Sequence, residues 1–527
     1  MRRHLRPMLA FSAVAYLALG CQVVGSPTSA GAGGAGTNGS TSGSNSNSTA
    51  TGAGGGSMAS ESSDTAPAVD PKGDFAQCLV SGDLSPAIFL SIPHARSTVS
   101  ATQVRGQVAA TPAEIPVPSA TRGPELLNYY HLNYSTTSAT EITVVPELQV
   151  TGVMGQLVLQ IGIQAPPSDS AHRRPTAVTV LVDTSKSMEG ESLKRANAAV
   201  LALSESLNAG DVLNVVTTNP DVAPIHRVAT IAADPALFPV DQPLTVSGSG
   251  DVGAALARAY TSATAAGSYL VGGLNRVVVI TDGGGLPESI DSRLVNDNWV
   301  NQRIALVGVG VGLAGSYSPA LLDNATTVGH GPNLYLDSPA VAEAQLHLRF
   351  DEVMDEALHD VSIGFQLPTL FKVVNPDLVG GDVGEGELAT SDLGSGRSMV
   401  FRHAVSIPCP QLDTTVLTTM SMTVTVSWND PALPDRQSRH YTFGLDTLLD
   451  KKPTNAYRKA SAVIAFTNAL QSLQVTRFLA ACGEVATAHA SNLSGPTDPE
   501  LDSIVAQINA HPVMVEKGVT CPAMNNP

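Results

Sequence analysis

The chain has few charged residues and, beyond its first six residues, no cluster of basic ones. Asp, Glu, Lys and Arg make up only 14% of its 527 residues, and the formal net charge is −17. The adjacent pairs Arg173–Arg174 and Lys451–Lys452 stand alone. Because phosphate binding relies on clustered Lys and Arg, we expect no nucleic-acid partner. An acidic surface of this kind suits cations better than it suits anionic partners such as nucleic acid.

The sequence also lacks a long apolar segment and a metal-type cysteine pair. A helix that spans a bilayer needs about 20 apolar residues, and the longest candidate, residues 8–19, is shorter. None of the five cysteines forms a C-x-x-C pair, which argues against a zinc or thioredoxin-like site. The length predicts several domains, and 47 Gly and 35 Pro indicate extensive loops.

The first residues have the three-part layout of a secretory signal. Arg2, Arg3 and Arg6 precede the apolar run, and small residues lead up to Cys21. Removal of this leader would take away three positive charges and bring the net charge to −20. The sequence therefore predicts an exported protein.

Residues 18–21, Ala-Leu-Gly-Cys, resemble a bacterial lipobox, although the family prefers Leu where Ala18 stands. The resemblance implies a lipoprotein signal peptide at residues 1–21 and lipidation of Cys21. Gln22 follows the cysteine where lipoproteins of the inner membrane often carry Asp. In a Gram-negative organism this implies lipid anchoring at the outer membrane or cell surface, with no other attachment to the membrane.

Residues 22–74 are expected to form a disordered tether, since they consist largely of Gly, Ser, Thr, Ala and Asn. The four remaining cysteines are Cys78, Cys409, Cys482 and Cys521. Their even number in an oxidising compartment predicts two disulfides, in any of three pairings.

Three further regions follow the tether. Residues 75–170 are β-rich, with expected strands at 87–92, 141–150 and 156–164. Residues 171–361 alternate apolar strands with helices, which indicates an α/β fold with a doubly wound parallel sheet; the pattern closes with an expected long helix at 340–360. Residues 362–527 are predicted to form an α+β region, in which the expected strands are 361–371, 398–406 and 420–428 and the expected helices are 457–473 and 501–509. Within 171–361, the expected strands are 176–183, 212–217, 276–281 and 304–311, and the expected helices are 193–207, 252–264, 288–300 and 319–326.

Two loops of the predicted sheet carry oxygen ligands. Asp183, Ser185 and Ser187 follow the first strand as Asp-x-Ser-x-Ser, and Asp282 follows a central strand. Ligands in such sheets bind at the carboxyl ends of the strands. Carboxylates and hydroxyls suit Mg²⁺, Mn²⁺ or Ca²⁺. With hydroxyls dominating the ligand set, the cation keeps net positive charge and an open position for an acidic group of a protein partner.

These residues resemble the von Willebrand factor A domain and its metal-ion-dependent adhesion site, over residues 176–360. In that family a third loop supplies a threonine, but here Gly250 stands in the aligned place, and Ser249 is the candidate substitute. Lys186 replaces the usual Gly, and its positive charge should weaken metal binding. The segment 127–134, Leu-Asn-Tyr-Tyr-His-Leu-Asn-Tyr, resembles the N-terminal extension of a bacterial subfamily that also has an uncharacterised C-terminal domain.

Two patterns are interpreted as structural. Residues 310–315 match G-x-G-x-x-G, with Asp337 about 20 residues on, but they follow a late strand of an exported chain and are interpreted as a Gly-rich turn. His330 and His226 have no ligand-spaced neighbour and are expected in loop or surface roles.

No nucleophile and base pair is visible, so we expect no enzyme. The expected function is protein binding or adhesion through the metal; the alternative is a metal-free scaffold of the cell envelope, with contacts made by the flanking domains.

Overall fold

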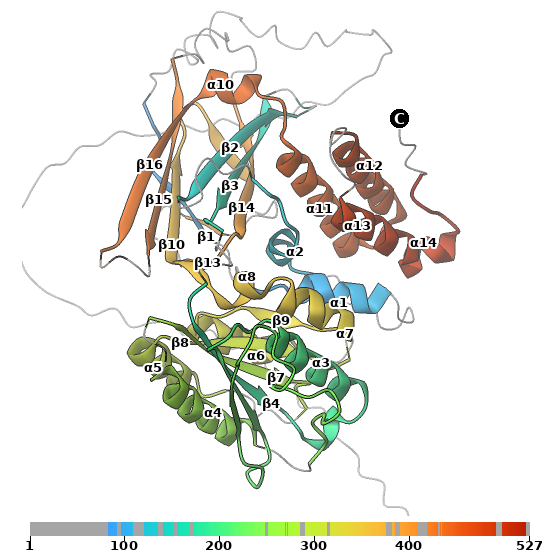
Figure 1. The fold of residues 1–527 in the computed structure, drawn as a ribbon. Helices are drawn as coiled ribbons and strands as arrows, with labels where there is room; N and C mark the ends of the chain where they lie inside the picture. Colours follow the sequence, from blue (N-terminus) through green and yellow to red (C-terminus); the bar gives the residue numbers. More distant parts are fainter. Residues whose placement is uncertain are drawn as a thin grey trace, which may run out of the picture. The chain divides into compact units, whose positions relative to one another are not determined.

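The structure is a computed structural model of the full chain (Figure 1). It describes residues 83–91, 96–108, 121–134, 141–151, 153, 155–167, 173–247, 251–268, 270, 272–284, 290–313, 317–375, 382–384, 390–407, 419–430, 433, 435–491 and 498–522. Outside these residues lie the predicted signal peptide and tether, Cys21, Cys78, Cys409, Ser249 and Gly250. The described residues all belong to one compact unit, Asp70–Pro527.

The middle of the chain forms a six-stranded sheet in the order β6-β5-β4-β7-β8-β9. Neighbouring strands from β5 to β9 are parallel, whereas β6 pairs antiparallel with β5 at the edge. This order confirms the doubly wound α/β fold expected from the sequence; β6 and β9 were not foreseen. The strands are β4 Thr176–Val182, β5 Val212–Thr217, β6 Ile225–Val228, β7 Leu274–Thr281, β8 Ile304–Gly310 and β9 Asn333–Tyr335.

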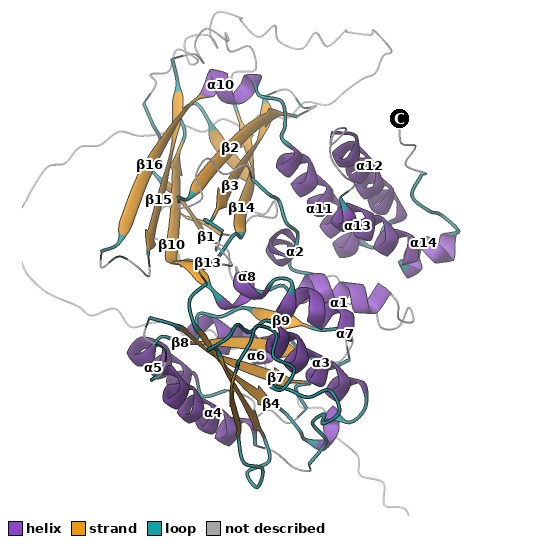
Figure 2. Ribbon diagram, in the orientation of Figure 1, coloured by secondary structure: helices purple, strands orange, loops and turns teal. Residues whose placement is uncertain are grey.

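Helices cover both faces of this sheet, as Figure 2 shows. The central strand β4 is apolar throughout because it is buried on both sides: Val180 belongs to the apolar cluster of one face and Leu181 to that of the other. On the Val180 face lie α3 Glu191–Glu205, α7 Pro339–Ala342, a π-helix Glu343–His347 and α8 Phe350–Met354; on the Leu181 face lie α4 Val252–Gly267, α5 Ser292–Gln302 and α6 Ala320–Val328.

The long helix predicted at residues 340–360 was wrong in its last third. The helical segment is broken by the π-helix and ends at Met354, and the chain then enters strand β10, Glu356–Gln366. Residues 356–360 contain no β-branched side chain, so the sequence carries no strand signal there. Pairing with β13 and β15 incorporates them into a strand instead, with an irregularity at Asp360, whose φ is 50°.

Strands from both sides of the sheet domain build one β-sandwich. One sheet has the order β12-β1-β10-β15-β16, with β13 pairing to β10, and the other has the order β11-β14-β3-β2. The strand β3 pairs along its whole length with β14, about 240 residues later in the chain, and the two sheets enclose a shared apolar core. The strands are β1 Ile88–Ser91, β2 Thr143–Val150, β3 Gln156–Gln164, β11 Lys372–Asn375, β12 Asp382–Gly384, β13 Ser391–Gly394, β14 Ser398–Ser406, β15 Ser421–Asn429 and β16 Gln437–Gly444.

The remaining helices form a separate apolar cluster. It includes the tyrosines of the segment 127–134; Tyr134 packs against β3, where a Cβ on Gly162 would come within 2.1 Å of its ring. The helices are α1 Val99–Val108, α2 Gly123–Tyr129, α11 Asn455–Ser472, α12 Val475–Ser491, α13 Pro499–Ala510 and α14 Pro512–Lys517; α10 Leu445–Asp450 contacts β2. Among the described residues, no helix has the length and apolar character that crossing a membrane requires.

His403 of β14 is an unsatisfied polar group in the sandwich core. Its side chain is fully buried, it stacks near Phe365, and neither ring nitrogen has a hydrogen-bond partner among the described residues. Burial lowers its pKa to about 4 from 6.5. Because the unfolded chain takes up a proton at higher pH than the folded one, the protein loses stability as the pH falls from about 6.5 to about 4.

Replacing His403 by Leu should therefore stabilise the protein, most of all in mild acid. We expect a gain of about 1–3 kcal/mol at pH 7, because an unpaired buried polar group is removed, and a larger gain at pH 5. Urea denaturation at both pH values measures it. The control is His440→Leu, since His440 is exposed and bonded to Thr425. Equal acid sensitivity of the wild type and His403→Leu would contradict the prediction.

Candidate metal-dependent binding site

The two loops that carry the predicted ligands emerge at the same edge of the sheet. Asp183 follows β4 and Asp282 follows β7, and these two strands are parallel neighbours, with Val182 opposite Ile280. Because parallel strands end at a common edge, the two loops are adjacent. This is the edge at which doubly wound sheets bind ligands.

Asp183 is buried at the base of the site and organises the first loop. Its Oδ1 accepts a hydrogen bond from the Ser185 backbone N–H at 2.9 Å, and its Oδ2 accepts one from the Thr281 hydroxyl at 2.9 Å. A short 3₁₀ turn, Lys186–Met188, follows and brings the hydroxyl oxygens of Ser185 and Ser187 to 3.0 Å from each other. The alternate residues of Asp-x-Ser-x-Ser thus face one point.

The second loop closes the site from the β7 side. The Ser187 hydroxyl donates to Asp282 Oδ1 at 3.1 Å, and the Gly284 backbone N–H donates to the same oxygen at 2.8 Å. A Cβ on Gly284 would lie 2.5 Å from Ser187 Oγ, so this close approach needs glycine. The structure therefore brings the four predicted residues together.

The third loop contacts the first through a residue that the sequence did not single out. Ser247 donates its backbone N–H to the Thr184 carbonyl at 3.0 Å, and the two side-chain hydroxyls lie 2.8 Å apart. Thr184 is fixed in turn by Thr218, whose hydroxyl accepts from the Thr184 backbone N–H. Ser247 precedes the predicted Ser249 by two residues, so its place beside the site could have been found in the same stretch of sequence.

Two glycines of the motif at residues 310–315, Gly310 at the end of β8 and Gly312 in the loop that follows, lie at close approaches. A Cβ on Gly310 would lie 2.2 Å from the Tyr317 ring, and one on Gly312 would lie 2.9 Å from the Asp282 carbonyl oxygen. Arg195 donates to the carbonyls of residues 311 and 312 and holds this loop in place. Gly310 and Gly312 thus serve close packing, Gly312 beside Asp282, in agreement with the interpretation of this motif as a turn; Gly315 lies outside the described residues.

The donor set consists of hard oxygen ligands of the kind that small divalent cations prefer. Octahedral Mg²⁺ binds oxygens at about 2.0–2.1 Å, which places adjacent ligands about 2.9 Å apart. The oxygen separations are 3.0 Å from Ser185 to Ser187 and 3.1 Å from Ser187 to Asp282. The two carboxylates, Asp183 and Asp282, supply the negative charge. Lys186 is exposed, on the same turn.

Comparisons with known proteins give similarities of structure only. No family model and no curated protein matches the sequence. Similar solved structures include a von Willebrand factor type A protein from Catenulispora acidiphila, with 16% identity and a TM-score of 0.38, covering 73% of this chain and 89% of that one. The pilus adhesin SpaC from Lactobacillus rhamnosus GG has 12% identity and a TM-score of 0.29, covering 58% and 48%. These TM-scores are below 0.5, so the fold class rests on the strand order described above.

Proposed function

We propose that this chain is an exported, lipid-anchored protein that binds a protein partner through a divalent cation held by Asp183, Ser185, Ser187 and Asp282. The observation that carries the proposal is the convergence of these four side chains at the carboxyl edge of the sheet, with oxygen separations that fit Mg²⁺. The lipobox resemblance at Cys21 and the tether after it support display at the outer membrane or cell surface.

The chain's own residues define what the site would recognise. Asp183 has both oxygens engaged by Ser185 and Thr281, so it acts chiefly through its charge. A bound cation would supply an electrophilic position for an acidic group of the partner. Beside it, Leu313 exposes 64% of its surface directly after Gly312, and an exposed apolar side chain next to a charged centre suits protein contacts.

Replacement of Asp183 by Ala should abolish cation binding. Loss of this buried carboxylate removes negative charge and the hydrogen-bond acceptor of both Ser185 and Thr281. Calorimetric titration with Mg²⁺ or Mn²⁺ should therefore show an affinity at least about 100-fold weaker than that of the mature, unlipidated wild type. Asp297→Ala is the matched control, because Asp297 is exposed on α5, away from the site. Equal Mg²⁺ affinity of the Asp183→Ala variant and the wild type would refute the site.

A metal-free scaffold is the second candidate function, and one observation favours it. The Ser185 and Ser187 hydroxyls and the Asp282 carboxylate form hydrogen bonds with one another, and Asp183 accepts hydrogen bonds from Ser185 and Thr281, so the protein's own groups hold the loops in place. Gly250→Thr, which restores the side chain that the family resemblance implies, separates the two candidates. Mg²⁺ binding by the wild type supports the adhesion site, whereas binding only after Gly250→Thr supports the scaffold, with contacts made by the flanking domains.

A further inference from the structure

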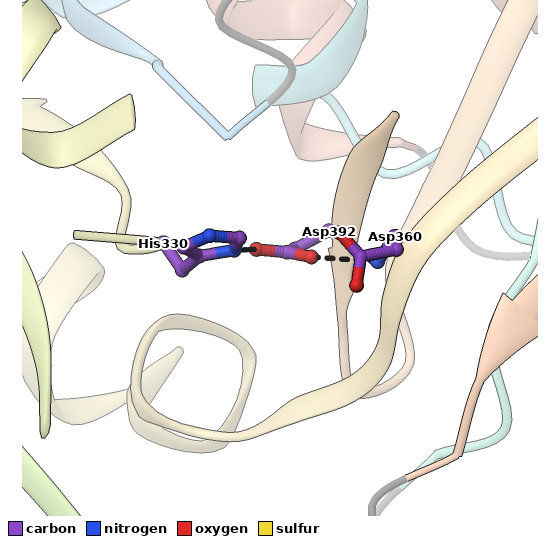
Figure 3. A group of neighbouring side chains, drawn as sticks. All are labelled: His330, Asp360 and Asp392. Carbon is purple, nitrogen blue, oxygen red and sulfur yellow. Dashed lines mark hydrogen bonds and ion pairs between the residues drawn. The ribbon is translucent and has the colours of Figure 1, made fainter. Parts of the chain in front are cut away.

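A second group of potential ligands lies far from the carboxyl edge of the sheet, where the sheet domain meets the sandwich. His330 follows α6, Asp360 belongs to β10 and Asp392 to β13. One ligand atom of each lies within 4.8 Å of those of the other two. Figure 3 shows His330 and Asp360 on opposite sides of Asp392. The sequence left His330 in a loop or surface role, because its partners are 30 and 62 residues away.

The hydrogen bonds of Asp392 hold the group together. Asp392 Oδ2 lies 2.6 Å from His330 Nδ1, and Asp392 Oδ1 accepts the Asp360 backbone N–H at 2.9 Å. A fourth donor is adjacent: His359 Nδ1 is buried, makes no hydrogen bond among the described residues, and lies 3.7 Å from Asp392 Oδ1. The Asp392 carboxylate is therefore the ion-pair partner of this buried nitrogen, which faces the group.

The backbone is constrained at two of these residues. His330 and Asp360 have left-handed conformations, with φ of 56° and 50°, which cost energy in residues other than glycine and often mark functional sites. The glycine on the C-terminal side of His330 allows a close approach: a Cβ on Gly331 would lie 1.9 Å from the Leu306 carbonyl oxygen. Trp299 stacks on the His330 ring at 4.3 Å. These contacts fix the imidazole before any ligand arrives.

We propose that His330, Asp360 and Asp392, joined by His359, bind a transition-metal ion of the Zn²⁺ class. Imidazole nitrogens mixed with carboxylate oxygens are typical ligands of Zn²⁺ and are poor ligands for Mg²⁺. Zinc–ligand distances of about 2.0–2.2 Å require adjacent ligand atoms about 3.3 Å apart, a spacing within reach of atoms that already lie between 2.6 and 4.8 Å from one another.

The ion has a route to the site and would act as a clamp. The side chain of His330 is 26% exposed, whereas that of Asp392 is 7% exposed, so the histidine side of the group faces solvent. Since His330 comes from the sheet domain and the other ligands come from sandwich strands, a bound ion would crosslink the two. This site is separate from the cation site at Asp183 and does not depend on the proposed adhesion function.

Titration of the mature Asp183→Ala chain with Co²⁺ and Zn²⁺ tests the proposal. In this background the carboxyl-edge site is disabled and the second group is intact. We expect one equivalent of Co²⁺ to give the visible absorption of a tetrahedral ion, Zn²⁺ to displace it, and Zn²⁺ to raise the melting temperature. Adding His330→Asn should weaken binding at least about 100-fold, because Asn tolerates the left-handed backbone but removes the imidazole.

The matched control is His226→Asn, on an exposed histidine of the edge strand β6. It should leave Co²⁺ binding unchanged. If the Asp183→Ala chain with His330 intact gives no tetrahedral Co²⁺ signal, the proposal is wrong. Equal Co²⁺ affinity of the chains with and without His330→Asn would also overturn it. If the Asp183 site of the wild type proved not to bind Mg²⁺, the expected results of these Co²⁺ titrations would stay the same.

Discussion

Glu356→Ala is expected to lower the free energy of unfolding by about 3–5 kcal/mol, the usual cost of removing one partner from a buried ion pair. Glu356 is 2% exposed; its Oε1 binds Arg96 at 2.6 Å and its Oε2 binds Arg276, which is 3% exposed. Burial alone would raise the pKa of Glu356, but Arg276 and Arg96 outweigh it, and the pKa is lowered. The variant would leave Arg276 charged, buried and without this carboxylate.

Urea denaturation at pH 7 measures the loss. Glu356→Gln should fall between the wild type and the alanine variant, because it keeps one hydrogen-bond acceptor but not the charge. Glu191→Ala serves as the control: Glu191 forms an exposed pair with Lys194, and exposed pairs contribute little, so its denaturation curve should coincide with that of the wild type. A Glu356→Ala curve that also coincides would refute the assigned role of the ion pair.

Glu356 also shows where sequence reasoning reaches its limit. Four strands of the sheet, β4, β5, β7 and β8, were predictable because each is a largely apolar, β-branched run that alternates with helices along the chain, whereas the short strands β6 and β9 were not predicted. At Glu356 the helix gives way to a strand without any compositional signal. The partners Arg96 and Arg276 lie 260 and 80 residues away, and only the folded chain brings them together.

The candidate cation site was more accessible to prediction than the metal group at the domain boundary. Asp183, Ser185 and Ser187 are contiguous, and the parallel pairing of β4 with β7 adds Asp282. The group at His330 assembles from two layers of the molecule instead. Its geometry depends on the pairing of β13 with β10, which no local sequence pattern predicts.

The sandwich shows the same limit for long-range pairing. The sequence indicated the individual strands β3 and β14 with accurate bounds, as residues 156–164 and 398–406. It assigned them to separate regions on either side of the sheet domain, whereas they pair with each other over nine residue positions. Alternation of buried and exposed residues specifies which face of a strand is buried, but it does not specify the neighbouring strand.

The disulfide between Cys482 and Cys521 should contribute about 4 kcal/mol, since it closes a loop with a sequence separation of 39 residues. This bond is compatible with only one of the three pairings that the sequence left open. It links α12 to the segment after α14 and so restrains α13 and α14, which lie between. Without it, the unfolded chain gains the conformational freedom of that whole loop.

A double variant, Cys482→Ala with Cys521→Ala, isolates this contribution. Alanine leaves no free thiol to form a wrong pair and adds no hydroxyl to a buried position; the two cysteines are 4% and 9% exposed. The urea midpoint of the variant should fall to that of the reduced wild type if the Cys482–Cys521 bond dominates the effect of reduction. Peptide mapping of the oxidised wild type should find Cys482 joined to Cys521. If the oxidised wild type and the double variant have the same urea midpoint, the packing of the terminal helices does not depend on the bond.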